Sequence, residues 1–134
     1  MTNPFSDDAV PLKLLRERAF NLRWAQLDGA DLRACDLRAA RLRDCQLAGA
    51  NAKGADLRDV DLSAAVLCHA DLSGADLRGA KLGGAKLDGV VLRGADLRDA
   101  IGLTPPQLAA AVTDAETRLP VPVREIVRRP TVVR

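Results

Sequence analysis

The amino-acid sequence predicts an all-β solenoid that is closed on its C-terminal side by an α-helix. From residue 20 to residue 99 the chain consists of sixteen consecutive five-residue units without an insertion or a deletion. The third residue of the unit is Leu in fifteen of them, and the first residue is Ala in eleven. After residue 99 this period ends and signals for a helix follow. A fixed short period of this kind indicates stacked structural repeats.

A period of five fits neither a single α-helix nor a single continuous strand. On a helix a five-residue step turns by about 140°, so the leucines would be spread around the axis instead of forming a stripe. On a strand an odd step places successive leucines on opposite faces. Within one unit, however, the two apolar residues are two positions apart, which lets both point inward from a short extended segment. The chain must therefore turn in every unit.

The fifth position of the unit indicates where the chain turns. It is Gly in eight of the sixteen units, and Gly tolerates the backbone conformations of tight turns. Repeated turns of one hand produce a coil, and stacked coils pair their backbones at about 4.7–4.9 Å. The sequence thus predicts a solenoid with ladders of Leu and Ala inside.

The units resemble the signature A-[D/N]-L-x-x of the pentapeptide-repeat family, and the resemblance covers residues 20–99 of the 134-residue chain. It implies a right-handed quadrilateral β-helix with four units in each coil, and hence about four coils. Two units depart from the pattern. Phe20 is a large first residue, which we expect to plug the open N-terminal end. Ala52 replaces the usual Leu, and we expect a small void or an inward shift of the backbone there.

Signals for a C-terminal cap follow the last unit. Thr104 is expected to be the N-cap of a helix, Pro105 its first residue, and Gln107 the capping-box partner. Leu103 and Leu108 occupy the positions of a hydrophobic staple. The sequence predicts a helix over 105–118, with an apolar face that packs on the last coil and consists of Leu108, Ala111, Val112, Ala115 and Leu119. The motif G-L-T-x-x-Q-L resembles the end of the repeat in many bacterial family members.

These signals divide the chain into four segments. We expect an N-terminal segment or cap over 1–19, with helix-like spacing in its second half, and the β-helix over 20–100. The capping helix lies within 101–119, and a basic and apolar tail follows over 120–134. The start of the sequence carries no apolar run typical of a signal peptide, and no stretch is apolar enough to span a membrane. A cytoplasmic protein is the expectation.

The composition argues against an enzyme. The chain has one His and no Tyr, and no spacing typical of a nucleophile and its base, a phosphate loop or a metal site is present. We therefore expect no catalytic residue, no cofactor, no metal and no small-molecule substrate. Cys35 and Cys45 are first-position residues and should be buried. Cys68 and His69 should be two exposed neighbours, too few for a metal site.

Charge points to one surface. Residues 20–100 carry nine Arg and three Lys against twelve Asp, so the repeat is neutral, and the net charge of +2 comes from the segment after it. When units are grouped by every fourth, one wall repeats Asp at its second position and Arg at its fourth. This Asp–Arg wall consists of Asp36, Arg38, Asp56, Arg58, Asp76, Arg78, Asp96 and Arg98. Exposed pairs of this kind contribute about 0–1 kcal/mol each, so the wall is either a self-neutralised surface or a docking surface.

Three functions are compatible with these features. The first is a non-catalytic scaffold or interaction protein that presents a flat surface to an unidentified protein partner. The second follows from the resemblance, because some family members bind DNA gyrase or topoisomerase by imitating DNA; a neutral repeat disfavours it. The third is nucleic-acid binding through the basic tail, a weak signal. The C-terminal region also offers contacts for a homodimer, for which the candidates are Leu108, Val112, Leu119, Ile126 and Val127.

Overall fold

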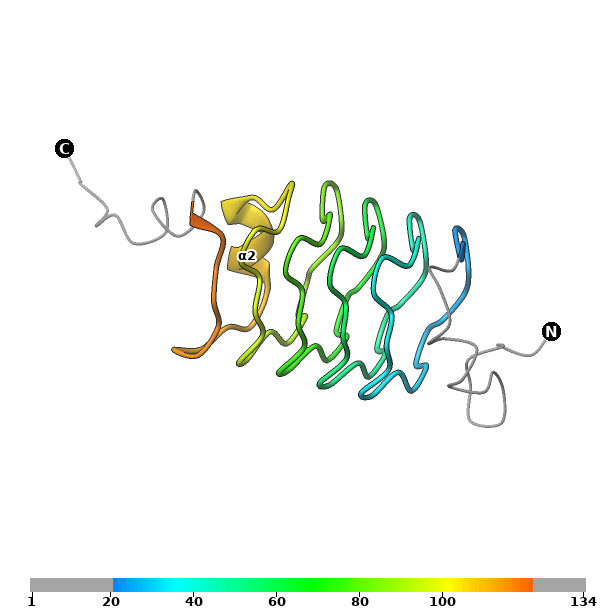
Figure 1. Ribbon diagram of the computed structural model, residues 1–134, viewed down its shortest axis with the longest axis horizontal. Helices are drawn as coiled ribbons and strands as arrows, with labels where there is room; N and C mark the ends of the chain where they lie inside the picture. The colour runs from blue at the N-terminus through cyan, green and yellow to red at the C-terminus, as the bar shows by residue number, and fades with distance from the viewer. Residues whose placement is uncertain (1–20, 122–134) are drawn as a thin grey trace.

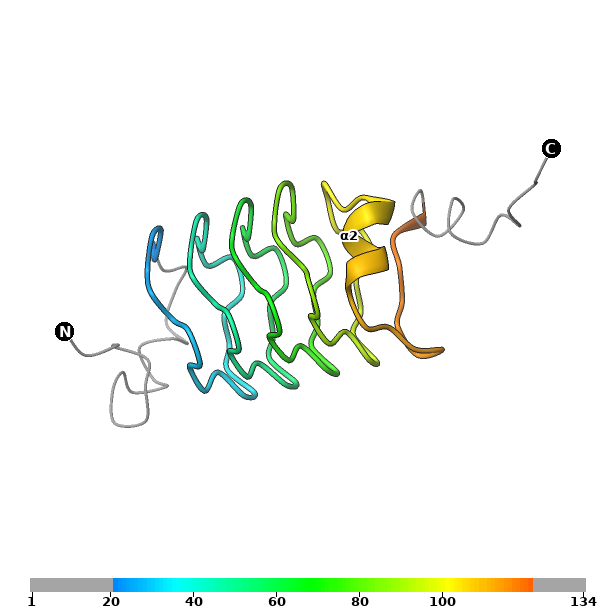
Figure 2. The same cartoon turned by 180° about the vertical axis from the view of Figure 1, so that it is seen from behind.

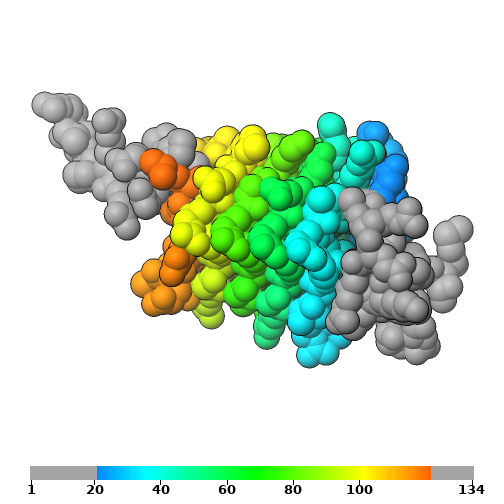
Figure 3. Space-filling model, in the orientation of Figure 1, coloured from blue at the N-terminus to red at the C-terminus, as the bar shows by residue number. Residues whose placement is uncertain are grey.

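A computed structural model describes residues 21–121 as a solenoid of stacked coils (Figure 1). The second residue of each unit forms a parallel bridge to the residue twenty positions further on, beginning with Asn21 and Arg41 and continuing to Lys81 and Ile101. Twenty residues are four units, so each coil has four walls. In the space-filling view the coils follow one another as successive bands of colour along the long axis (Figure 3).

Backbone hydrogen bonds join each coil to its two neighbours. The Leu27 N–H donates to the Gln46 carbonyl of the next coil over 2.6 Å, and the Gln46 N–H donates back to the Ala25 carbonyl over 2.9 Å. The Ala30 N–H closes the corner on the Leu27 carbonyl over 3.0 Å. This pattern recurs around the solenoid. Since only the second residue of each unit is bridged, the described chain contains no strand longer than a single residue.

The first and third residues of the units fill the interior, as the sequence predicts. From Leu27 to Leu97 every third-position side chain and every first-position side chain is buried. The described core holds no buried polar or charged residue. Leu103 and Leu108 join the same core at its C-terminal end. Small first residues are required here because the central leucines leave little room beside them.

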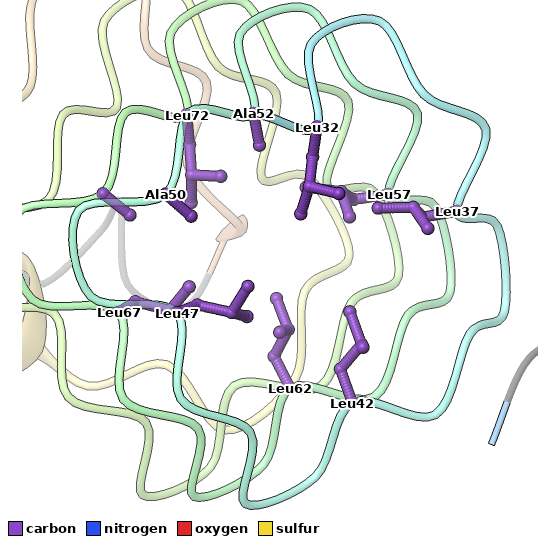
Figure 4. Close-up of a pocket in the computed structure, with 11 residues that line it drawn as sticks. Leu32, Leu37, Leu42, Leu47, Ala50, Ala52, Leu57, Leu62, Leu67 and Leu72 are labelled. Atoms are coloured by element: carbon purple, nitrogen blue, oxygen red, sulfur yellow. The ribbon is translucent and has the colours of Figure 1, made fainter. Parts of the chain in front are cut away.

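Ala52 leaves a cavity in the core. It lies between Leu32 and Leu72 on one wall, and the leucines of the neighbouring walls point into the same space (Figure 4). The cavity has a volume of about 10 Å³ and only apolar side chains line it. A space of this size and character holds no ordered water. The backbone keeps its register at this point, because the Ala52 N–H donates to the Asp71 carbonyl over 2.8 Å.

The fifth residue of each described unit has a positive φ, which explains the glycines. Eight of these positions are not Gly, and they include Trp24, Ala64 and His69. At Ala64 φ is 60°, in the left-handed region that side chains other than Gly adopt at a cost. The corner conformation is therefore imposed by the coil and not by the glycine.

The C-terminal end differs from the prediction. The helix α2 covers Pro105–Ala110 only, and the chain then becomes extended at Ala111, with φ −96° and ψ 162°. Val112 bridges to Val91 and Arg118 bridges to Asp96, so the chain resumes the solenoid instead of continuing as a helix to residue 118. Figure 2 shows this segment beyond α2, wound in the same sense as the coils before it.

The open edges of two walls explain why the helix is short. The Leu92 N–H donates to the Val112 carbonyl over 2.7 Å, and the Leu97 N–H donates to the Arg118 carbonyl over 2.7 Å. Without residues 111–118 in an extended course, these donors would lack the bonds that every earlier coil supplies. Tertiary pairing therefore overrides a helical preference of the sequence. Val112 and Ala115, which we expected on the packed face, are exposed.

Gln107 connects α2 to the solenoid. Its Oε1 accepts a hydrogen bond from the Thr104 N–H over 2.8 Å, which is the contact expected of the capping-box partner. Its Nε2 donates to the carbonyls of Leu82 and Ala85, both over 2.9 Å. The helix thus follows the wall that begins with Gln26, where the Gly89 N–H donates to the Ala110 carbonyl over 2.8 Å.

Several predictions concern residues outside the described range of 21–121. These are the N-terminal segment or cap over 1–19, the plug at Phe20, and the tail from residue 122 onward. Within the described range, no helix has the length and hydrophobicity needed to cross a lipid bilayer.

Candidate protein-interaction surface

The Asp–Arg wall forms as the sequence pattern suggests. Each Asp accepts two hydrogen bonds from the guanidinium two residues further on, from Nε and from Nη2. In the pair of Asp56 and Arg58 these contacts measure 2.9 and 2.6 Å. The pairs that begin at Asp36, Asp76 and Asp96 have the same two-point geometry. Such planar pairing is the strong form of the Arg–carboxylate contact.

The pairs are also connected from coil to coil. Nε of Arg38 lies 3.6 Å from Oδ2 of Asp56, and the corresponding distances are 3.7 Å from Arg58 to Asp76 and 3.8 Å from Arg78 to Asp96. We call the Asp–Arg pair of each coil a rung. The Arg of each of the first three rungs, namely Arg38, Arg58 and Arg78, therefore faces two carboxylates. The like charges stacked along each column are neutralised by this alternation, which leaves the wall ordered and without net charge.

Asp at the second position has a further role that the pattern alone did not reveal. Its Oδ1 accepts the backbone N–H of the residue two positions on, as between Asp76 and Arg78 at 3.2 Å. The same contact occurs where the partner is not Arg, between Asp71 and Ser73 at 3.0 Å. The contact is an Asx turn, for which Asp and Asn are suited. The Asp-or-Asn preference of the signature, together with the corner after it, is the signal that would have predicted this turn.

The hydrogen bonds determine the charge state of the wall. The guanidiniums of Arg38, Arg58, Arg78 and Arg98 lower the pKa of the partner carboxyls at Asp36, Asp56, Asp76 and Asp96, and the backbone N–H groups lower it further. The carboxylate also raises the pKa of each Arg. The wall is thus fully ionised at neutral pH.

The other walls carry isolated pairs instead of a network. On the wall that begins with Asp31, that residue pairs with Arg33 over 2.8 Å, and Lys53 reaches Asp71 over 3.5 Å. On the wall that begins with Asn21, Arg23 lies 3.8 Å from Asp44. Continuous alternation through four rungs is therefore a property of the Asp–Arg wall among the residues that the structure describes.

The predicted C-terminal contacts separate into three groups. Leu108 is buried and Leu119 is partly buried, so both serve the cap itself. Val112 is 37% exposed, and Ile101 and Val121 are exposed as well. Ile126 and Val127 lie outside the described residues. A groove of about 450 Å³ opens at this end, lined by Pro105, Leu108, Ala109, Ala111, Thr113 and Leu119.

The cysteines and the single His do not form a site. Cys45 is buried and donates from Sγ to the Leu22 carbonyl over 2.8 Å, and burial raises the pKa of its thiol to about 11. Cys68 is half-buried instead of exposed, with Sγ 3.8 Å from Oδ2 of Asp88. His69 is exposed at a corner. Within residues 21–121, no three His, Cys, Asp or Glu side chains are grouped as metal ligands.

Trp24 lies at an outward corner of the first described coil, with a positive φ of 68°. Its side chain is 68% exposed, and the Arg23 guanidinium lies 5.9 Å from the centre of the ring. This contact is a cation–π arrangement of the exposed kind.

Comparison with known proteins decides the family. A sequence profile described as "Pentapeptide repeats (8 copies)" matches residues 21–59, 45–84 and 75–101, which together span more than half of the chain. The chain belongs to the pentapeptide-repeat family. The four-sided solenoid described above is therefore the right-handed quadrilateral β-helix of pentapeptide-repeat proteins, as the resemblance implied.

A solved structure of another pentapeptide-repeat protein agrees with the fold. Rfr23 from the cyanobacterium Cyanothece 51142 is 30% identical, with a TM-score of 0.63 over 71% of this chain and 64% of that protein. This chain thus spans less than two thirds of the length of Rfr23. A protein from the thylakoid lumen of Arabidopsis thaliana is 27% identical, with a TM-score of 0.38 over 84% of this chain and 68% of that one.

A more distant match is QnrB1, a plasmid-mediated fluoroquinolone resistance protein. It is 19% identical, with a TM-score of 0.43 over 83% of this chain and 58% of that one. A search among curated proteins gave no significant match.

Proposed function

We propose that this pentapeptide-repeat chain is a non-catalytic interaction module that binds a protein partner through the Asp–Arg wall. The observation that carries the proposal is the uninterrupted alternation of Asp and Arg through four coils, held by two-point pairs and linked by contacts of 3.6–3.8 Å. A partner meets side chains whose positions are already fixed. Little conformational entropy is therefore lost when it binds.

The interior supports a role in binding rather than catalysis. Leucines and small residues fill the coils, and the space at Ala52 amounts to about 10 Å³. Small-molecule sites in proteins are clefts of about 300–1,000 Å³ with a few convergent polar groups. The groove of about 450 Å³ at the C-terminal end has that size, but Thr113 is the one polar side chain among the described residues that line it. The polar and charged side chains of residues 21–121 lie outside the core instead, where they are suited to contact another macromolecule.

Partner capture with matched variants tests the proposal. Arg58→Ala combined with Arg78→Ala removes the centre of the wall, whereas Arg33→Ala combined with Arg93→Ala removes the same charge from another wall. A partner retained by the wild-type protein and by the second variant, but lost by the first, supports docking on the wall. Equal retention by both variants would place the partner elsewhere. Thermal melts of each variant ensure that loss of binding does not reflect loss of folding.

Binding to gyrase or topoisomerase by DNA mimicry is the alternative. A DNA mimic offers negative charge to a basic groove, but each Asp of the wall is neutralised by its own Arg, and Asp56, Asp76 and Asp96 also face the Arg of the previous coil. This charge pairing disfavours the alternative. A supercoiling assay with this protein titrated in, with and without a quinolone, tests it directly: inhibition or protection at micromolar protein would establish the alternative.

A further inference from the structure

We infer that the partner of the Asp–Arg wall is a second copy of the same wall, bound face to face with the two solenoids side by side and parallel. The inference rests on the proposed function, because it names the occupant of the same surface. It differs from the homodimer predicted at the C-terminal region, which stays a prediction and is a competing outcome of the experiment below.

The guanidiniums retain donors for such a partner. A guanidinium carries five N–H donors. Arg58 and Arg78 use Nε and Nη2 on the carboxylates, and no interaction of their Nη1 atoms occurs among the described residues. Their side chains are 39% and 43% exposed. Each Arg therefore offers its second edge to a further carboxylate, and two-point binding by that edge is favourable.

The spacing of the rungs restricts what the partner is. Successive coils are separated by about 4.7–4.9 Å, so carboxylates that match the Arg column must repeat at the same interval. An α-helix repeats at about 5.4 Å per turn, and alternate residues of an extended chain lie about 6.4–6.8 Å apart. Both lose register over four rungs. A column of Asp on stacked coils keeps register, and this chain carries one: Asp36, Asp56, Asp76 and Asp96.

Charge then selects one orientation of the two copies. The wall has an Asp column beside an Arg column. Rotation about a two-fold axis parallel to the solenoid axis places the Asp column of each copy opposite the Arg column of the other, with equivalent coils at the same height. Rotation about an axis perpendicular to the solenoid axis, in the plane of the interface, places Asp opposite Asp and Arg opposite Arg. Like charges across an interface oppose association, so the parallel arrangement is selected. Such an interface is isologous, as in most homodimers.

Charge-swapped variants of the full chain test both the contact and its orientation. In the basic variant, Asp36→Lys and Asp56→Lys make the first two rungs positive. In the acidic variant, Arg38→Glu and Arg58→Glu make the same two rungs negative. Each variant alone should be a monomer, because equivalent rungs repel. Mixed together, the two should form a heterodimer whose dissociation constant is at least about tenfold lower than that of either variant alone.

A second acidic variant is the matched control for orientation. Arg78→Glu with Arg98→Glu makes the same charge change on the last two rungs. In a parallel dimer it meets neutral rungs where the basic variant is positive, so it should not pair with that variant. In an antiparallel dimer it would pair, and the first acidic variant would not. The choice of partner by the basic variant therefore reads out the orientation.

Sedimentation equilibrium at about 100 µM protein, where a weak interface is populated, gives the masses, and thermal melts confirm that every variant is folded. We expect a wild-type dimer that dissociates when salt is raised from about 0.05 M to about 1 M. A wild-type monomer under both conditions would overturn the inference. So would a dimer that survives the charge swaps and dissociates on deletion of residues 120–134. If the wild type is a monomer but partner capture still depends on Arg58 and Arg78, self-pairing fails while the proposed function stands.

Discussion

Nε of Arg58 lies 3.7 Å from Oδ2 of Asp76, one coil further on. Arg58 already holds the carboxylate of its own unit by two hydrogen bonds, so the contact with Asp76 joins two otherwise separate pairs. Repetition of this relationship converts a row of exposed ion pairs into a network that spans the solenoid. Networks of charges contribute more than isolated surface pairs, which are worth about 0–1 kcal/mol.

Substitution of Asp76 separates the role of its charge from its role in the turn. Asp76→Asn keeps an oxygen for the Arg78 N–H but loses the ion pair, so it should lower the free energy of unfolding by less than about 1 kcal/mol. Asp76→Ala also removes the acceptor of the turn and should cost about 1 kcal/mol more. Urea denaturation measures both. Equal losses for the two variants would show that the Asx turn contributes nothing.

The depressed pKa values of the wall carboxyls predict the pH dependence of stability. Because the pKa of each Asp is lower in the folded chain than in the unfolded chain, the unfolded state binds more protons in acid. Stability from these groups is present above the unfolded pKa of about 3.9 and is lost as pH falls through the folded values. The melting temperature should thus decrease below about pH 4. Asp→Asn changes at all four rungs should flatten that decrease.

The cavity beside Ala52 predicts opposite effects of two substitutions on one wall. Ala52→Leu restores the missing rung and should be neutral or stabilising, because the added carbons fill apolar space. Leu72→Ala enlarges the cavity and should cost about 2–5 kcal/mol. Thermal and chemical denaturation of the two variants check this order. The reverse order would mean that third-position side chains do not pack as described.

The left-handed corner at Ala64 predicts a stabilising change to Gly. With φ at 60°, Ala64 has a conformation that Gly adopts without strain, so Ala64→Gly should raise the free energy of unfolding by about 0.5–1 kcal/mol. The neighbouring Ala65→Gly is the control. Ala65 is fully buried in the core, and its loss of a methyl group should be destabilising. Differential scanning calorimetry of the pair distinguishes relief of strain from a general effect of Gly.

The double contact of Gln107 predicts that a nearly isosteric change is harmful. Nε2 of Gln107 donates to the carbonyls of Leu82 and Ala85, and Gln107→Glu would place carboxylate oxygens against both. We expect a loss of about 1–3 kcal/mol and faster hydrogen exchange of the Leu108 amide in α2. Unchanged exchange at Leu108 would show that α2 does not depend on this contact.

The walls of the solenoid were predictable because they follow from local repetition. With a five-residue period and a corner in each unit, a coil is the only arrangement that buries the Leu at the third position of every unit. The Asp–Arg wall follows once each coil consists of four units. The hydrogen bonds within that wall were harder to predict from the sequence. The pattern places Asp beside Arg, but it does not reveal that the same carboxylate also accepts the N–H of the turn, as Asp76 does from Arg78.

The period, the inward positions, the corners and the pairing of Asp with Arg within a unit could be predicted from the sequence, because each is contained in one five-residue unit and its repetition. The tertiary structure decided the C-terminal end. Residues 111–118 have a sequence compatible with helix, but Leu92 and Leu97 of the previous coil offer N–H groups that the carbonyls of Val112 and Arg118 accept. Unpaired backbone donors at an open edge are costly, and that cost is a property of the stacked coil, which no local stretch of sequence contains.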